Sequence, residues 1–266
     1  EARGVILGQF AIFGFFSLAA VLYFQARRKD ALAGALLTIS TIKPTLVFLV
    51  IPFFLLWGLV HKRWAFLAGF LGVMAVLLAG SFLVLPTWLG EWLLRIRTYS
   101  DYTVGQSPVW LLTHQTLPFL GAAGEIVLSL LLAAGMLFAW QLALRPGGQP
   151  WFHWALGVTL VVSSLIVPRS ATTNYVLMLV TALWIFAALE RTPGWGRPVL
   201  LVTWLVSLVG LWWLHFATVI GNQEQPVMFI PLPLAMGLVL IMGYQWLLRD
   251  AVHLKLSLRG SGIGRW

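Results

Sequence analysis

Two basic residues, Lys43 and Arg169, stand at breaks in long apolar runs, where a positive charge is costly to hold. Lys43 is followed by Pro44, and Arg169 follows Pro168. A charge at membrane depth is usually kept for a partner or a ligand, and a guanidinium suits two-point contact with a phosphate. Each residue could instead be an anchor whose long side chain reaches the membrane interface. Both interpretations stay open for both residues.

Polar neighbours could support an anionic ligand near these bases. Four hydrogen-bonding side chains follow Arg169: Ser170, Thr172, Thr173 and Asn174. Gln9 follows Gly8 near the start of the chain, where the amide could bond to another helix or the pair could simply allow close packing. Asn174 and Gln9 are therefore supporting candidates.

A hydrophilic stretch, residues 86–118, carries the other candidates for chemistry. Asp101 or His114 could act as a general base, although solvated loop residues of these types are common. One helix face is predicted by the spacing of four apolar residues, Trp88, Trp92, Leu93 and Ile96, and a helix with such a face is expected to lie on the membrane surface. The length of the stretch favours a lid or binding role.

The composition decides what must position these residues. The chain has 266 residues, of which 60% are hydrophobic and 9% charged, and its mean hydropathy is +0.91. These values exclude a soluble domain. The apolar runs have the length of about 20 residues that a helix needs to cross a bilayer. The sequence therefore predicts an all-α, polytopic transmembrane helical bundle.

Eight segments form this predicted transmembrane domain, residues 1–248, and a basic cytoplasmic tail follows at 249–266. Seven are full spans and one is a broken-helix hairpin: 5–25, 31–60 (the hairpin), 65–85, 119–144, 151–167, 175–189, 199–218 and 227–248. The turns on both sides of 31–60 are basic, so a single span would place one of them outside the cell. Pro44 supplies the break, and two half-length helices meet near Lys43.

The charge balance and the motifs of the chain indicate its location and limit the classes of partner and cofactor that it can bind. The chain has seventeen Lys and Arg residues against eight Asp and Glu, and in a membrane protein such an excess usually lies in cytoplasmic loops. We therefore expect a multi-pass protein of the cell membrane, in this interpretation a bacterial inner membrane. Because topology explains the basic residues, no nucleic-acid partner is expected. The chain has no cysteine, no nucleotide-binding loop and no metal-ligand motif, so no cofactor and no metal are expected.

Three segments resemble polytopic GT-C glycosyltransferases, and glycosyltransferase family 87 most of all. They are LGQF at 7–10, LAGALLTISTIKPTLVFLVIPFFLL at 32–56 with HKRW after it, and VPRSATTNYVLMLV at 167–180. That family comprises polyprenyl-phosphate-mannose-dependent mannosyltransferases. The resemblance implies a lipid-phosphate sugar donor, an extracytoplasmic acceptor and metal-independent inverting transfer, with Lys43 and Arg169 on the donor phosphate.

In such enzymes the catalytic acid lies in the first outer loop, a region that would precede Glu1. The resemblance therefore implies that this chain holds the lipid-donor half of the site without the expected base. Asp101 and His114 are candidates for the base by residue type alone. The alternative is a non-catalytic membrane subunit that binds partner subunits in a larger complex. A transporter is a third possibility, but the sequence has no inverted repeat.

Overall fold

The computed structural model describes residues 10–102, 106–167, 172–220 and 225–249, and every regular element in them is a helix. The all-α prediction is confirmed. The chain divides into two compact units, described separately below. The first comprises Glu1–Ser107 with Val167–Leu177, and the second comprises Pro108–Ile166 with Met178–Trp266. The boundary after Ser107 falls within the predicted outer loop.

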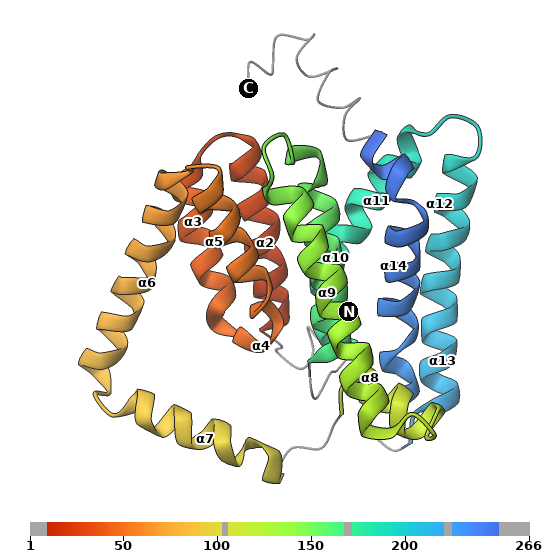
Figure 1. Ribbon diagram of the computed structural model, residues 1–266, viewed down its shortest axis with the longest axis horizontal. Helices are drawn as coiled ribbons and strands as arrows, with labels where there is room; N and C mark the ends of the chain where they lie inside the picture. Colours follow the sequence, from red (N-terminus) through yellow and green to blue (C-terminus); the bar gives the residue numbers. More distant parts are fainter. Residues whose placement is uncertain (1–9, 103–105, 168–171, 221–224, 250–266) are drawn as a thin grey trace. The chain divides into compact units, whose positions relative to one another are not determined.

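The first unit contains the predicted hairpin and the helices around it (Figure 1). Its elements are α2 (Ala11–Ala26), α3 (Asp30–Ile39), η1 (Ser40–Ile42), α4 (Pro44–Val47), α5 (Val50–Val60), α6 (Trp64–Val84), α7 (Trp88–Tyr102) and η4 (Thr172–Met178, whose last residue belongs to the second unit).

The helix break at Lys43 is confirmed. Lys43 has φ −128° and ψ 79°, an extended conformation of the kind that the following Pro44 imposes. Pro44 then occupies the first turn of α4, where its missing N–H costs nothing. Helix α5 completes the return, so α3 and α5 form the two limbs of a hairpin whose tip carries Lys43.

The two basic turns lie at the same end of the first unit. Arg63 donates two hydrogen bonds, from Nε and Nη2, to the two carboxylate oxygens of Asp30, each 2.6 Å long. The carboxylate sits in the first turn of α3, where the helix dipole favours a negative charge. It also offsets the positive charge of Arg63 at the start of α6. The hairpin therefore begins and ends side by side.

Helices α3 and α6 cross closely because two glycines remove side chains from the contact. A Cβ added at Gly34 would overlap the backbone of Phe66, and one added at Gly69 would overlap the backbone of Ala31. This close approach lets the Thr38 hydroxyl donate a 3.1 Å hydrogen bond to the Phe70 carbonyl. Small residues play this part in membrane helix pairs.

The second unit is built around α10 (Figure 1). Its elements are α8 (Pro108–Leu111), η2 (Leu112–Thr116), α9 (Gly121–Leu144), η3 (Gln149–Trp151), α10 (Phe152–Ile166), α11 (Leu179–Arg191), α12 (Gly196–Leu205), η5 (Val206–Gly210), α13 (Leu211–Thr218), η6 (Pro226–Phe229) and α14 (Pro231–Met242).

Two indole N–H groups join α10 to its neighbours. Trp140 of α9 donates to the Thr159 hydroxyl at 2.8 Å, and Trp154 of α10 donates to the Leu240 carbonyl of α14 at 2.9 Å. Gly157 allows α10 to approach α11 and α14, because an added Cβ would press on Thr181 and Leu240. Polar bonds inside an apolar bundle fix the register of the helices.

Within the residues that the structure describes, four helical stretches are long and apolar enough to cross a membrane: Trp64–Val84, Gly121–Leu144, Thr172–Arg191 and Gly196–Thr218. The other predicted spans form shorter apolar helices in the described residues. Helix α10, for example, has 15 residues, fewer than the about 20 of an upright crossing. Proline and glycine residues at the helix ends account for such shortening.

Replacing Gly34 by alanine should separate α3 from α6. The added methyl overlaps backbone that cannot rotate away, so the free energy of unfolding should fall by about 1–3 kcal/mol. Gly72→Ala is the matched control on α6, because nothing lies within 4 Å of its Cβ position. Thermal unfolding in detergent compares the two. Equal stability of both variants would contradict the close crossing.

The hairpin also predicts sidedness in a membrane. Because the chain has no cysteine, Arg28→Cys, Lys62→Cys and Lys43→Cys each create a unique label site. In intact cells, an impermeant thiol reagent should label position 43 and leave positions 28 and 62 unlabelled. Labelling of position 62 without position 43 would show that the orientation is wrong.

Candidate functional site

Lys43 and Asn174, two residues singled out in the sequence, are in direct contact in the first unit. The Lys43 Nζ donates a 2.7 Å hydrogen bond to the Asn174 Oδ1, although the residues are 131 positions apart. Both side chains are half-buried. The structure thus joins the KP break of the hairpin to the segment that follows Arg169.

The segment η4 holds Asn174 in place by burying its neighbours. It is a seven-residue 3₁₀-helix in which Thr173, Tyr175 and Leu177 are buried. Leu177 packs at Gly14 of α2, where a Cβ on the glycine would stand 3.5 Å from a leucine methyl. A 3₁₀ run of this length is uncommon and often marks a functional or strained region. Here it turns the Asn174 amide toward the hairpin tip.

Hydroxyl groups complete the end of α3 beside the tip. Ser40 donates to the Leu37 carbonyl at 2.6 Å, and Thr41 donates to the Thr38 carbonyl at 2.6 Å. Both carbonyls also accept backbone N–H groups at the C-cap of α3, so each hydroxyl adds a further bond to a carbonyl that is already paired. The α3 end is thereby stable without a longer helix, which leaves Lys43 at the break.

The Lys43–Asn174 contact fixes the position of the Lys43 ammonium group. An amide oxygen carries no net charge, whereas an Asp or Glu partner would cancel the ammonium. An ammonium has three N–H donors, so a bond to an amide is compatible with bonds to a phosphate. The geometry suits the binding of an anionic group at the hairpin tip.

Three predicted site residues have little or no description in the structure. Gln9 and Arg169 lie outside the described residues, and Asp101 is described only as part of the helical backbone of α7. Their roles therefore stay predictions.

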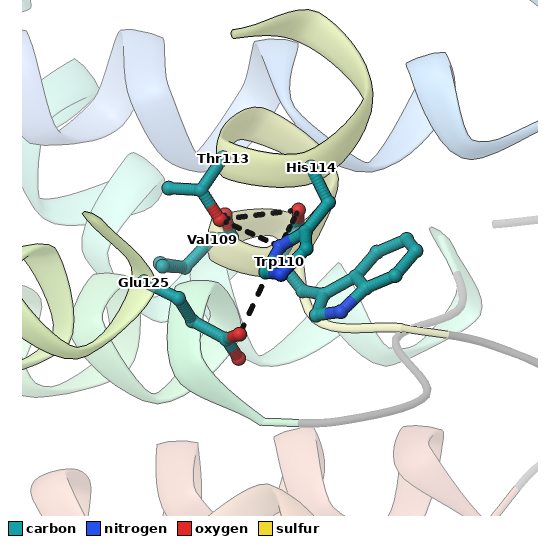
Figure 2. A network of polar contacts seen from close by, with 5 residues as sticks. All are labelled: Val109, Trp110, Thr113, His114 and Glu125. Atoms are coloured by element: carbon teal, nitrogen blue, oxygen red, sulfur yellow. Dashed lines mark hydrogen bonds and ion pairs between the residues drawn. The ribbon is translucent and has the colours of Figure 1, made fainter. Parts of the chain in front are cut away.

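His114 lies in the second unit, on a π-helical turn. The turn η2 is closed by a 2.8 Å bond from the Leu117 N–H to the Leu112 carbonyl. Figure 2 shows the imidazole of His114 between the Thr113 hydroxyl and the Glu125 carboxylate. The indole of Trp110 stacks on the ring, with centroids 4.7 Å apart and planes 9° apart. Such π turns occur frequently at functional sites.

The contacts of His114 converge on its Nδ1. This atom lies 3.0 Å from the Thr113 Oγ1, 3.2 Å from the Trp110 carbonyl oxygen and 3.8 Å from Glu125 Oε2. A carbonyl can only accept, so a proton on Nδ1 satisfies the Trp110 contact. A neutral ring with this proton on Nδ1 has its lone pair on Nε2.

Comparisons with protein-family models, with curated proteins and with solved structures gave no match. Within the described residues, no group of three His, Cys, Asp or Glu side chains could hold a metal ion.

Two partners in these contacts were missed in the sequence. Neither Glu125 nor Asp30 is among the residues predicted above to form a site. An acid within the basic stretch 27–30 was the one signal for a salt bridge. Glu125 carries no comparable signal, because it lies in α9 whereas His114 lies in the separate element η2.

Removing the amide of Asn174 should weaken the anchor of Lys43. Asn174→Leu deletes the acceptor and should lower the free energy of unfolding by about 1 kcal/mol. Asn174→Asp keeps an acceptor and should retain the stability. Thr45→Val is the control, because Thr45 is exposed on the same hairpin tip. Thermal unfolding measures all three, and an equal loss in the Leu and Asp variants would refute the role of this bond.

Proposed function

We propose that the chain is a multi-pass glycosyltransferase of the cell membrane, or the C-terminal portion of one. It transfers a sugar, mannose according to the resemblance, from a polyprenyl-phosphate donor to an extracytoplasmic acceptor. The single observation that supports this proposal best is the contact between Lys43 and Asn174. It joins two of the three segments on which the resemblance to GT-C enzymes rests.

The reaction requires stabilisation of a leaving phosphate. An acceptor hydroxyl attacks C1 of the sugar, the bond from C1 to the phosphate oxygen breaks, and the hydroxyl proton passes to a base. The polyprenyl phosphate leaves with one more negative charge than the donor carried. Lys43, held by Asn174, would supply positive charge where this negative charge develops, which is a large catalytic term. Arg169 would supply a second, two-point contact.

The base is a separate part of the proposal. By the resemblance, the base is an acid in the first outer loop of such enzymes. His114 is a substitute candidate, since its Nδ1 contacts leave Nε2 able to accept a proton. Asp101 is the other. The donor-binding role of Lys43 does not depend on which group takes the proton.

Loss of the Lys43 charge should weaken binding of polyprenyl phosphate. Lys43→Met keeps the apolar bulk and removes a charge-assisted contact, so the Kd should rise roughly tenfold or more. Lys62→Met is the matched control, a lysine in the basic turn after α5, at the other end of the hairpin. Native mass spectrometry with a short-chain polyprenyl phosphate measures the affinity. If Lys43→Met binds polyprenyl phosphate as tightly as the parent does, Lys43 is an interfacial anchor and the proposed donor site is wrong.

Arg169→Met should weaken binding to the same degree, with Arg259→Met in the basic tail as its control.

Transfer from polyprenyl-phosphate-mannose to an acceptor is then assayed in membranes that contain the natural full-length protein. Tight binding without transfer, in a protein that carries all its natural helices, would favour the non-catalytic subunit.

A further inference from the structure

Helix α7 leaves the end of a candidate membrane span at a fixed corner. Helix α6 ends at Val84, and α7 begins at Trp88 after three intervening residues. The Trp88 and Phe82 rings lie 5.5 Å apart across this corner, and the Thr87 hydroxyl donates a 2.7 Å hydrogen bond to Glu91. In Figure 1, α7 turns sharply from the direction of α6. Because α6 is a candidate membrane span, α7 begins at the level where that span would leave the bilayer.

The apolar side chains of α7 form a continuous exposed stripe, here called the α7 stripe. Its members are 40–50% exposed: Leu89, Trp92, Leu93 and Ile96. At 3.6 residues per turn they share one side of the helix, and Glu91 falls on the other side. Four large apolar side chains exposed together on one helix indicate a surface that is covered in the working protein.

Two arginines border the α7 stripe. By helical position, Arg95 lies at one edge, next to Trp88 and Trp92, and Arg97 lies at the other, next to Leu93. Long cationic side chains at the edges of an apolar face can bury their stems and extend their charges to phosphates. Tryptophan at the same face is typical of the boundary between hydrocarbon and headgroups.

We propose that the α7 stripe binds the surface of the bilayer, with Arg95 and Arg97 in contact with the phosphates of lipid headgroups. Charge complementarity supports a lipid partner, since two cations border the apolar side and the acid Glu91 faces away from it. Continuity supports it too, because only 6% of the most apolar window of the preceding α6 is buried, so the whole α6–α7 corner presents apolar surface outward. This inference does not depend on the proposed sugar transfer.

Adjacent leucines provide a sharp test of this orientation. Leu93 is in the stripe, whereas Leu94 lies on the opposite side of the helix, although both are exposed. In the full chain, which has no cysteine, Leu93→Cys, Ile96→Cys, Leu94→Cys and Gly90→Cys are labelled with a fluorophore in phospholipid vesicles. Quenching by nitroxide-bearing lipids is compared with quenching by aqueous iodide.

Labels at positions 93 and 96 should be quenched by the nitroxide lipids at least about twofold more strongly than labels at 94 and 90. Iodide should show the reverse order. Equal access of iodide to all four labels would overturn the proposal, because α7 would then lie in water. Protection of 93 and 96 from both quenchers would overturn it as well, because a protein would then cover the stripe.

The arginines are tested separately with anionic lipid. In vesicles that contain phosphatidylglycerol, each arginine should raise the ratio of docked to undocked α7 by about fivefold. The increase is measured relative to vesicles of phosphatidylcholine alone. The double variant R95Q/R97Q should lose it, and R95K/R97K should retain it. An increase that survives in R95Q/R97Q would show that the arginines do not bind headgroups.

Discussion

The break before Pro44 is the constraint on which the first unit depends. Proline removes one backbone donor and forces Lys43 into an extended conformation, so a helix cannot continue through this point. The chain must then return through α5, which brings the turn before α6 back to the turn before α3. The same break leaves Lys43 at the hairpin tip, where η4 can supply Asn174. A continuous helix would give neither arrangement.

The pairing of α3 with α6 is stabilised by polar and packing contacts, each of which depends on the others. The two hydrogen bonds between Arg63 and Asp30 set the start of α6 against the start of α3. Gly34 and Gly69 then allow the backbones to touch, and that approach brings the Phe70 carbonyl within reach of Thr38. Hydrophobic burial gives little preference between partners in lipid, so close packing and polar bonds must fix the pairing. A larger residue at either glycine would separate the groups that make the other contacts.

Much of this arrangement follows from local sequence, and the rest does not. The hairpin could be predicted because Pro44 and two basic turns are local signals, and Lys43 with Asn174 could be chosen because each is a polar group beside a break. Their mutual contact spans 131 positions, and the pairing of Asp30 with Arg63 spans 33, so no periodicity reports either. The π turn at His114 was equally hidden, since the sequence LTHQT carries no signal that distinguishes it from an α-helical turn. The roles of Gln9 and Arg169 stay predictions, because both lie outside the described residues.

In the described residues, the hydroxyl and indole groups have a different physical role from the Lys43 ammonium. Most hydroxyls and indoles bond to backbone carbonyls or to one another, as Trp154 does with Leu240, and thereby remove polar groups from an apolar surrounding. Lys43 differs because its ammonium keeps its charge when it bonds to an amide. Burying part of a charged group costs free energy unless other groups bond to it, and Asn174 supplies one such bond to Lys43. The contact with Asn174 thus holds the ammonium at the hairpin tip, where the proposed donor phosphate would bind.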